Sequence, residues 1–339
     1  HKEYRRQRQM CIRDRDYVFY SDSGSTSVEV AIKMALGYWR NRGAPRTRIL
    51  ALEHGYHGDT IGTMSAGARS PFNAAYEPLL FDVARIPFPA AGVEQATFDA
   101  LERSCREGAA AFVVEPLILG AGGMLIYAAE TLAEMKRICE KYGVLFIADE
   151  VMTGFGRTGT LFACEQAGVT PDIACYSKGL TGGALPLAVT MCRREIFEAH
   201  LSPERARAFF HSSSYTANPI ACAAALANLD VWEKTDARAR VAALCDMQAA
   251  QLARFADDRR FSNVRRIGTI AALDLTVAQS GYLATISLDL IKFFNARGLL
   301  LRPLGPTIYV LPPYCVTETE LALVYAAIDE AADVFAGSA

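Results

Sequence analysis

The sequence predicts an α/β fold in which a mostly parallel sheet carries helices on both faces and a smaller α+β domain follows. Three observations support this prediction. From Tyr17 onward, short apolar runs alternate with stretches of helical periodicity, as in βαβ units. The apolar runs are nearly continuous, as in strands buried on both faces of a parallel sheet. After about residue 235 the pattern changes, which predicts a large domain at 17–235 and a small domain at 236–339.

The elements of the large domain follow from this pattern in order. A first strand at 18–20 ends at a turn of small polar residues, and a helix at 26–40 then places Val28, Ile32 and Trp39 on one face. Short apolar runs predict further strands at 48–52, 110–114, 144–148, 173–176 and 187–192. Apolar periodicity predicts helices at 129–141 and, rich in alanine, at about 218–232.

The small domain combines helices with a few strands. The same reasoning predicts helices at 237–256, 286–297 and 318–335 and strands at 264–275, 299–301 and 308–311. At the other end of the chain, residues 1–16 are rich in arginine and show no regular period. We expect 1–16 to be a basic segment that is foreign to the fold.

Composition limits the function classes. The chain has 339 residues, of which 51% are hydrophobic and 21% charged, as in a globular protein with a large core. A formal net charge of −2 gives no general attraction to nucleic acid or membrane, so neither is expected as a partner. The nine cysteines include no C-x-x-C pair, which argues against a disulfide framework and a metal site. Reduced thiols, with no visible signal peptide or long apolar span, predict a cytoplasmic location.

The most informative residues are a carboxylate and an amine that follow two successive strands. Asp149 follows the apolar run 144–148, and Lys178 enters a turn of small residues after 173–176. Pyridoxal phosphate (PLP) chemistry needs this pair, because a lysine holds the aldehyde as a Schiff base and an acid keeps the pyridine nitrogen protonated. The lysine must be neutral to attack a carbonyl, so we expect Lys178 to be desolvated. The alternative, a solvated surface lysine, is disfavoured by apolar neighbours and by Gly179, which leaves room for a ligand.

Other segments have both a functional and a purely structural interpretation. The turn 21–25 joins a strand to a helix, so it could bind a phosphate at the helix N-terminus or merely cap the helix. In 55–60 an aromatic residue between glycines could lie over a planar cofactor or at the surface. Arg157 and Arg302 could each bind a carboxylate or be solvated. The serines of 211–215 could bind phosphate or form local turns.

Together these motifs resemble the class III aminotransferase family of PLP enzymes. The resemblance runs in order from about Tyr17 to the C-terminus and rests on DSGS, GYHGDT, EPLILGAGGM, ADEVMTGFGRTG, LFACE, LTGG and LRPLGPTIYVLPPY. It implies the PLP-dependent transferase fold of type I, PLP as the cofactor and transamination as the reaction. It also implies a homodimer whose two subunits share each active site.

The resemblance further implies a role for each matching residue. Lys178 would hold the cofactor and shuttle protons, Asp149 would bind the pyridine nitrogen, and Tyr56 would stack on the ring, which makes these three the catalytic residues. The expected cofactor-binding residues are Gly24, Ser25, Tyr56, His57, Glu115, Asp149, Lys178 and, supplied to the partner subunit's site, Ser213 and Ser214. The expected substrate-binding residues are Tyr56, Asp59, Arg157, Ser212, Arg302 and Tyr309. Among these, Arg302 would bind the carboxylate of the keto acid.

Within the family, the segment LRPLGPTIYVLPPY is most similar to the aminotransferases of biotin synthesis. This implies S-adenosyl-L-methionine as amino donor and 8-amino-7-oxononanoate as acceptor. The sequence departs from the family pattern at 212–214, where Ser-Ser-Ser replaces Gly-Pro-Thr, and before DSGS, where the family has a longer segment. Three alternatives stay open: a class III transaminase with an ω-amino acid, lysine or diamine donor, a mutase or decarboxylase on the same fold, and an inactive truncated PLP-binding fold.

Overall fold

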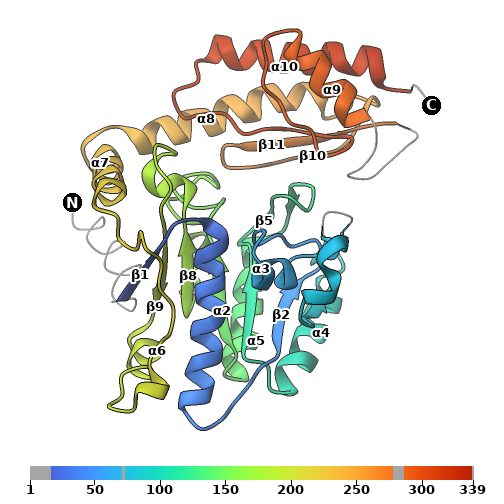
Figure 1. The fold of residues 1–339 in the computed structure, drawn as a ribbon. Helices are drawn as coiled ribbons and strands as arrows, with labels where there is room; N and C mark the ends of the chain where they lie inside the picture. Colours follow the sequence, from blue (N-terminus) through green and yellow to red (C-terminus); the bar gives the residue numbers. More distant parts are fainter. Residues whose placement is uncertain (1–16, 71–72, 278–285, 338–339) are drawn as a thin grey trace.

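The computed structural model describes residues 17–70, 73–277 and 286–337. A large part built on one sheet lies below a smaller part built on a second sheet (Figure 1). The predicted domain boundary at residue 235 lies between helices α7 (Pro219–Lys234) and α8 (Ala237–Leu252), and it stays a prediction. The segment 1–16, which we expected to be foreign to the fold, lies outside the described residues.

A mixed sheet of seven strands forms the large part. Its strand order is β1-β9-β8-β7-β4-β2-β3, and the five strands from β8 to β3 run parallel. β9 is antiparallel to β8, and the edge strand β1 is antiparallel to β9. The strands are β1 (Tyr17–Ser21), β2 (Ile49–Leu52), β3 (Ala84–Ile86), β4 (Ala111–Val114), β7 (Leu145–Asp149), β8 (Ile173–Tyr176) and β9 (Ala188–Cys192).

Helices cover both faces of this sheet (Figure 1). In β4, Phe112 and Val114 face the core shared with α4 and α5, whereas Val113 faces the core shared with α2. Burial on both faces explains why the strands are almost continuously apolar. The helices of the large part are α2 (Gly24–Asn41), α3 (Ile61–Ala66), α4 (Glu94–Arg106), α5 (Ala129–Lys141), α6 (Arg194–Glu198) and α7, with short 3-10 turns at Ala74–Leu79, Ala163–Glu165, Lys178–Thr181 and Arg205–Arg207.

The small part is an antiparallel sheet of three strands with helices on its outer side (Figure 1). Its strands are β10 (Phe261–Ile267), β11 (Ile270–Leu275) and β12 (Thr307–Val310), and its helices are α8, α9 (Ile286–Asn295) and α10 (Glu318–Phe335), with a 3-10 turn at Ala253–Phe255. Tyr325 and Phe294 are fully buried in its core. A two-stranded ribbon of the large part, β5 (Ile118–Leu119) and β6 (Leu125–Ile126), lies between the two sheets.

Most elements appear where the sequence predicts them, and the helices at 129–141 and 318–335 have the predicted bounds. The single strand predicted at 264–275 is wrong, because the chain reverses at Gly268 (φ 54°) and forms the β10–β11 hairpin. The strand predicted at 299–301 is not formed. The strands β3, β5 and β6 and the helices α3, α4 and α6 were not predicted. Among the described residues, no helix has the length and apolar character needed to cross a bilayer.

Candidate active site

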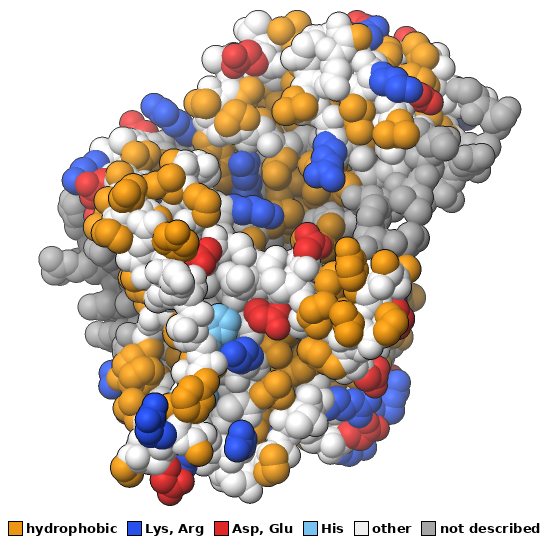
Figure 2. All heavy atoms as spheres, viewed as in Figure 1, with side chains coloured by type: hydrophobic (Ala, Val, Ile, Leu, Met, Phe, Trp, Pro, Cys, Tyr) orange, Lys and Arg blue, Asp and Glu red, His pale blue; other side chains and the backbone are white. Residues whose placement is uncertain are grey.

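A cavity of about 1670 Å³ opens between the carboxyl ends of the large sheet and the small part. Figure 2 shows this hollow with both basic and acidic side chains around it. Most of the predicted site residues line it: Gly24, Ser25, Tyr56, His57, Asp59, Glu115, Asp149, Arg157, Lys178, Arg302 and Tyr309. In an open α/β sheet, ligands bind at the carboxyl ends of the strands, which is where this cavity lies.

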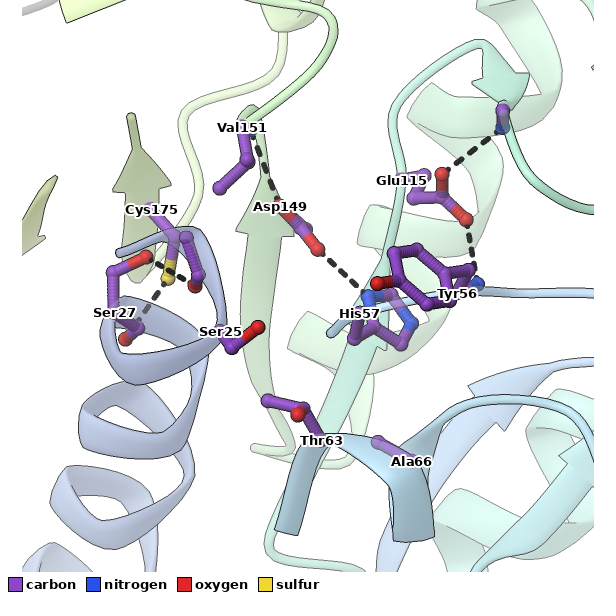
Figure 3. A network of polar contacts seen from close by, with 12 residues as sticks. Ser25, Ser27, Tyr56, His57, Thr63, Ala66, Glu115, Asp149, Val151 and Cys175 are labelled. Carbon is purple, nitrogen blue, oxygen red and sulfur yellow. Dashed lines mark hydrogen bonds and ion pairs between the residues drawn. The ribbon is translucent and has the colours of Figure 1, made fainter. Parts of the chain in front are cut away.

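Asp149 is the last residue of β7 and is buried at the base of the cavity. Its Oδ2 lies 2.8 Å from Nδ1 of the buried His57, and its Oδ1 accepts a hydrogen bond from the Val151 amide at 3.1 Å (Figure 3). These contacts fix the orientation of the carboxylate. A buried carboxylate held in this way can pair with a cation in the cavity, as a pyridinium requires.

Lys178 follows β8 and begins a short 3-10 turn. Its φ of 38° lies in the left-handed region, which is uncommon for a residue with a side chain and is often found at functional sites. Gly179 allows the turn to pass Phe155 closely, since an added Cβ would lie 2.7 Å from the Phe155 Cβ. The expectation that Lys178 is desolvated is not met in this chain, because its side chain is exposed to the cavity.

The turn before α2 presents backbone donors to the cavity. Ser23 caps the helix in a capping box with Thr26, so the capping interpretation of this turn is confirmed. Gly24 and Ser25 are the first helical residues, whose amides have no acceptor within the helix and can receive an anion. Gly58 (φ 128°) lies against Ser25, because an added Cβ would be 2.1 Å from the Ser25 Oγ. The turn is therefore capped by Ser23 and packed closely against Gly58.

Tyr56 places its ring at the cavity, where its side chain is 42% exposed. Its hydroxyl donates a hydrogen bond to Asp59 Oδ2 at 2.9 Å. Burial first, and then this hydrogen bond, raise the pKa of Tyr56 to about 12. The phenol therefore stays neutral at physiological pH, and Asp59 holds the ring in place.

Glu115 is a buried carboxyl that joins two loops around the cavity. Its Oε2 accepts from the Tyr56 amide at 2.9 Å and its Oε1 from the Gly120 amide at 3.0 Å (Figure 3). Burial raises the pKa of Glu115 to about 7, with nearby Asp149 also raising it and His57 opposing the shift. Such a group changes its protonation state near neutral pH.

The two predicted carboxylate-binding arginines differ in their surroundings. Arg157 donates to the Pro312 carbonyl at 2.6 Å and lies 4.5 Å from the ring centre of Tyr314. Burial lowers the pKa of Arg157. Arg302 is exposed at the cavity, and no carboxylate of the described residues pairs with it. Arg302 is therefore the arginine better placed to meet a ligand carboxylate.

The predicted serine cluster does not line the cavity of its own chain. Ser213 donates to Asp22 Oδ2 at 2.5 Å, and Ser212 and Ser214 are exposed. The cluster lies at the surface just before α7. Its predicted contacts with phosphate or substrate stay predictions.

A sequence model of the family described as aminotransferase class-III matches residues 5–332 of the chain. The chain belongs to the class III aminotransferase family. A curated relative, the adenosylmethionine-8-amino-7-oxononanoate aminotransferase of Synechococcus elongatus, is 48% identical over 93% of this chain and 76% of its own. The protein of the same name from Nitratidesulfovibrio vulgaris is 40% identical over 90% of this chain and 60% of its own.

Solved structures of aminotransferases and transaminases share the fold. The adenosylmethionine-8-amino-7-oxononanoate aminotransferase of Methanocaldococcus jannaschii superimposes with a TM-score of 0.91 at 31% identity, covering 98% of this chain and 78% of that one. A PLP-bound amine transaminase from an uncultivated Pseudomonas species has a TM-score of 0.89 at 30% identity, covering 98% and 80%. The predicted fold of type I and the predicted transaminase class are confirmed.

Pyridoxal phosphate is the cofactor of this class III aminotransferase, as predicted. The described residues fit it. Lys178 brings an exposed amine to the cavity, and the buried Asp149 provides a fixed carboxylate. The amides of Gly24 and Ser25 provide an anion site, and Gly58 has the close approach that only glycine allows there.

The structure adds cavity residues to this aminotransferase that the sequence did not reveal. Asn228 of α7 donates to the carbonyls of Gly179 and Leu180 at 2.8 and 3.1 Å, so it supports the turn after Lys178. An amide that interrupts the apolar, alanine-rich first part of the helix was the available signal. Arg265 also lines the cavity, and nothing in its local sequence distinguishes it from the neighbouring arginine.

Proposed function

We propose that this aminotransferase transfers the amino group of S-adenosyl-L-methionine to 8-amino-7-oxononanoate, which forms the 7,8-diaminononanoate of biotin synthesis. The observation that carries the proposal is the likeness to relatives and to a solved structure named for these two substrates, at up to 48% identity. The residues around the cavity also fit those two substrates.

When bound, PLP would supply the electron sink and the amino-group carrier that transamination needs. In the proposed assignment, the Lys178 amine moves the proton at the reacting carbon, and its position on a turn at the cavity gives it access to that carbon. Asp149, oriented by His57, stabilises positive charge on the cofactor ring. Tyr56 covers one side of the site and is held by Asp59.

Both proposed substrates carry a carboxylate, and the cavity offers a matching cation. Arg302 is exposed at the cavity, and its planar guanidinium can bind a carboxylate in bidentate fashion. Tyr309 lines the same cavity and is assigned, with Asp59, to recognition of the amino donor. The volume of about 1670 Å³ is ample for each substrate in turn.

We further propose that the functional unit is a homodimer in the cytoplasm. Ile220 and Leu226 of α7 are 70% and 65% exposed, and Tyr215, just before the helix, is 70% exposed. An apolar surface of this kind marks an interface. Ser213 and Ser214 lie next to it, outside the cavity of their own chain, as expected of residues that serve a partner's site. Sedimentation analysis of the purified chain tests the dimer. The described cysteines are all free thiols, as in a reducing compartment.

The test is a spectrum of the PLP-loaded chain mixed with S-adenosyl-L-methionine alone. The visible band of the lysine-bound cofactor should decline while a pyridoxamine band grows, and 8-amino-7-oxononanoate should then restore it. A spectrum unchanged by S-adenosyl-L-methionine but converted by lysine, a diamine or an ω-amino acid would refute the proposed donor. Absence of a visible band with added PLP would instead mean that the chain does not form the cofactor site.

One observation favours a second candidate, an amine transaminase of different specificity. The amine transaminase from Pseudomonas superimposes almost as well as the Methanocaldococcus enzyme, with TM-scores of 0.89 and 0.91. Fold similarity does not determine the substrate, so the spectral test above includes amine donors as a separate arm.

A further inference from the structure

Arg265 connects the small sheet to the large part of the molecule. It lies on β10, and its Nε donates to the Met124 carbonyl at 2.9 Å while its Nη2 donates to the Gly123 carbonyl at 2.6 Å. Asp274 on the neighbouring strand accepts from Nη2 at 3.0 Å. The Arg265 side chain is only 11% exposed. A guanidinium with several fixed partners is held rigidly, which an ammonium group would not reproduce.

The two carbonyls belong to a backbone turn in an unfavourable conformation. Met124 has a φ of 53°, in the left-handed region that residues other than glycine rarely adopt, and Gly123 has a φ of 111°. The amides of both residues donate to the Gly120 carbonyl, at 3.2 Å from Gly123 and 2.9 Å from Met124. A strained backbone of this kind persists only where its surroundings determine it. Arg265 helps to fix this conformation, because it donates hydrogen bonds to the Gly123 and Met124 carbonyls.

The same turn is linked by hydrogen bonds through Glu115 to the loop that carries Tyr56. The Gly120 amide donates to one oxygen of Glu115 at 3.0 Å, and the Tyr56 amide donates to the other at 2.9 Å. Gly122 touches the backbone of the same segment, since an added Cβ would lie 2.2 Å from the His54 carbonyl oxygen. A displacement of the turn would therefore move the backbone that carries Tyr56.

We propose that Arg265 is a positioning residue of this transaminase: it clamps the turn 120–124, and through Glu115 it sets the position of Tyr56. Arg265 acts from the small sheet without touching substrate, in contrast to Arg302. The proposal rests on membership of the class III family and not on the identity of the amino donor, so it holds for whichever donor the enzyme accepts.

The test compares Arg265→Ala with Arg266→Ala as a matched control. Arg266 is the exposed neighbour on the same strand, and its side chain donates a hydrogen bond to the Gly268 carbonyl. Hydrogen exchange measured by mass spectrometry on the cofactor-free chain should show the amides of Tyr56 and Gly120 exchanging about tenfold faster in Arg265→Ala, since charge-assisted hydrogen bonds restrain the turn. Exchange in Arg266→Ala should match the wild type.

Kinetics on the PLP-loaded enzyme provide the second measurement. Because both half-reactions use the same cofactor-side residues, Arg265→Ala should lower kcat by about tenfold with the amino donor and with the acceptor, while KM stays nearly constant. Arg265→Lys keeps the positive charge but loses the planar guanidinium with its several donors. The exchange rates of the Tyr56 and Gly120 amides, and kcat, should therefore lie between those of the wild type and of Arg265→Ala.

Two results would overturn the proposal. In one, a folded Arg265→Ala variant shows wild-type exchange at Tyr56 and Gly120. In the other, only the KM of a carboxylate substrate rises, which would make Arg265 a substrate-binding residue. Should Arg265→Ala fail to fold, Arg265→Lys carries the same test, and wild-type exchange and kcat in that variant would equally refute the clamp.

Discussion

Replacing Glu115 with glutamine tests whether a buried carboxyl next to the cofactor position titrates near neutral pH. Burial, assisted by Asp149, raises the pKa of Glu115 to about 7. His57 and the hydrogen bonds that the carboxylate accepts from two backbone amides partly oppose this rise. In the unfolded chain a glutamate titrates at about 4.3. The folded chain therefore binds one more proton than the unfolded chain between these two values.

The sign of the effect on stability follows from this difference. A carboxyl whose folded pKa is raised contributes stability below the unfolded pKa, and this stability is lost as the pH rises toward the folded pKa. The difference of roughly 2.7 between the two pKa values corresponds to about 4 kcal/mol in total, and about 2.5 kcal/mol of it falls between pH 5 and pH 8. Glu115→Gln cannot ionise, so this pH dependence should disappear from the variant.

The assay is urea unfolding of the cofactor-free chain from pH 5 to pH 8. The free energy of unfolding of the wild type should fall by about 2–3 kcal/mol more than that of Glu115→Gln over this range. The comparison uses the difference between the two curves, so other titrating groups cancel. Glu130→Gln, an exposed glutamate at the start of α5, should keep the wild-type slope. Parallel curves for the wild type and Glu115→Gln would refute the raised pKa.

Three other substitutions have definite expected outcomes. Lys178→Ala should lose the visible absorbance of the lysine-bound cofactor and its trapping by borohydride while circular dichroism is unchanged; a trappable adduct in this variant would contradict the assignment. Arg302→Ala should raise the KM of the carboxylate acceptor by about tenfold to hundredfold with little change in kcat, and an unaltered KM would place the carboxylate elsewhere. Gly58→Ala should weaken PLP binding by more than about tenfold in fluorescence titration, because its φ is 128° and the new Cβ would meet Ser25. Gly92→Ala is the control for backbone strain alone, because Gly92 has a φ of 85° and an added Cβ there would have no neighbouring atom within 4 Å. Equal PLP affinity in the two variants would refute the crowding argument.

The sequence predicted the fold well where the signal is local, and it predicted which residues would meet at one cavity. The helix 318–335 begins at a capping box of Thr317 with Glu320 and carries an apolar stripe, so both its start and its buried face can be read from residues close in the chain. Asp149 and Lys178 follow apolar strands, and parallel strands end at one edge of the sheet. Their meeting at one cavity was therefore predictable.

Features that depend on distant contacts could not be read in the same way. The reversal at Gly268 forms where the hairpin fits against another loop, and an added Cβ there would lie 2.2 Å from the backbone carbon of Thr158. The left-handed φ of Met124 is supported by Arg265, which lies 141 residues away in the sequence. No periodicity or turn rule reports such partners, because the stabilising groups come from another part of the fold.

The positions of the proposed cofactor and substrate residues have a consequence for how this enzyme can change. Asp149 ends and Lys178 follows strands buried in the middle of the large sheet, whereas Tyr309 lies on β12, an outer strand of the small sheet among the described residues, and Arg302 lies in the loop before it. An edge strand has hydrogen-bonded neighbours on one side only, so replacements there disturb fewer partners than replacements in a central strand. Selection or design can therefore alter the accepted acids and amines through the segment 302–309 while the amine-transfer machinery stays intact. Exchange of this short segment between relatives is the natural starting point for changing substrate preference.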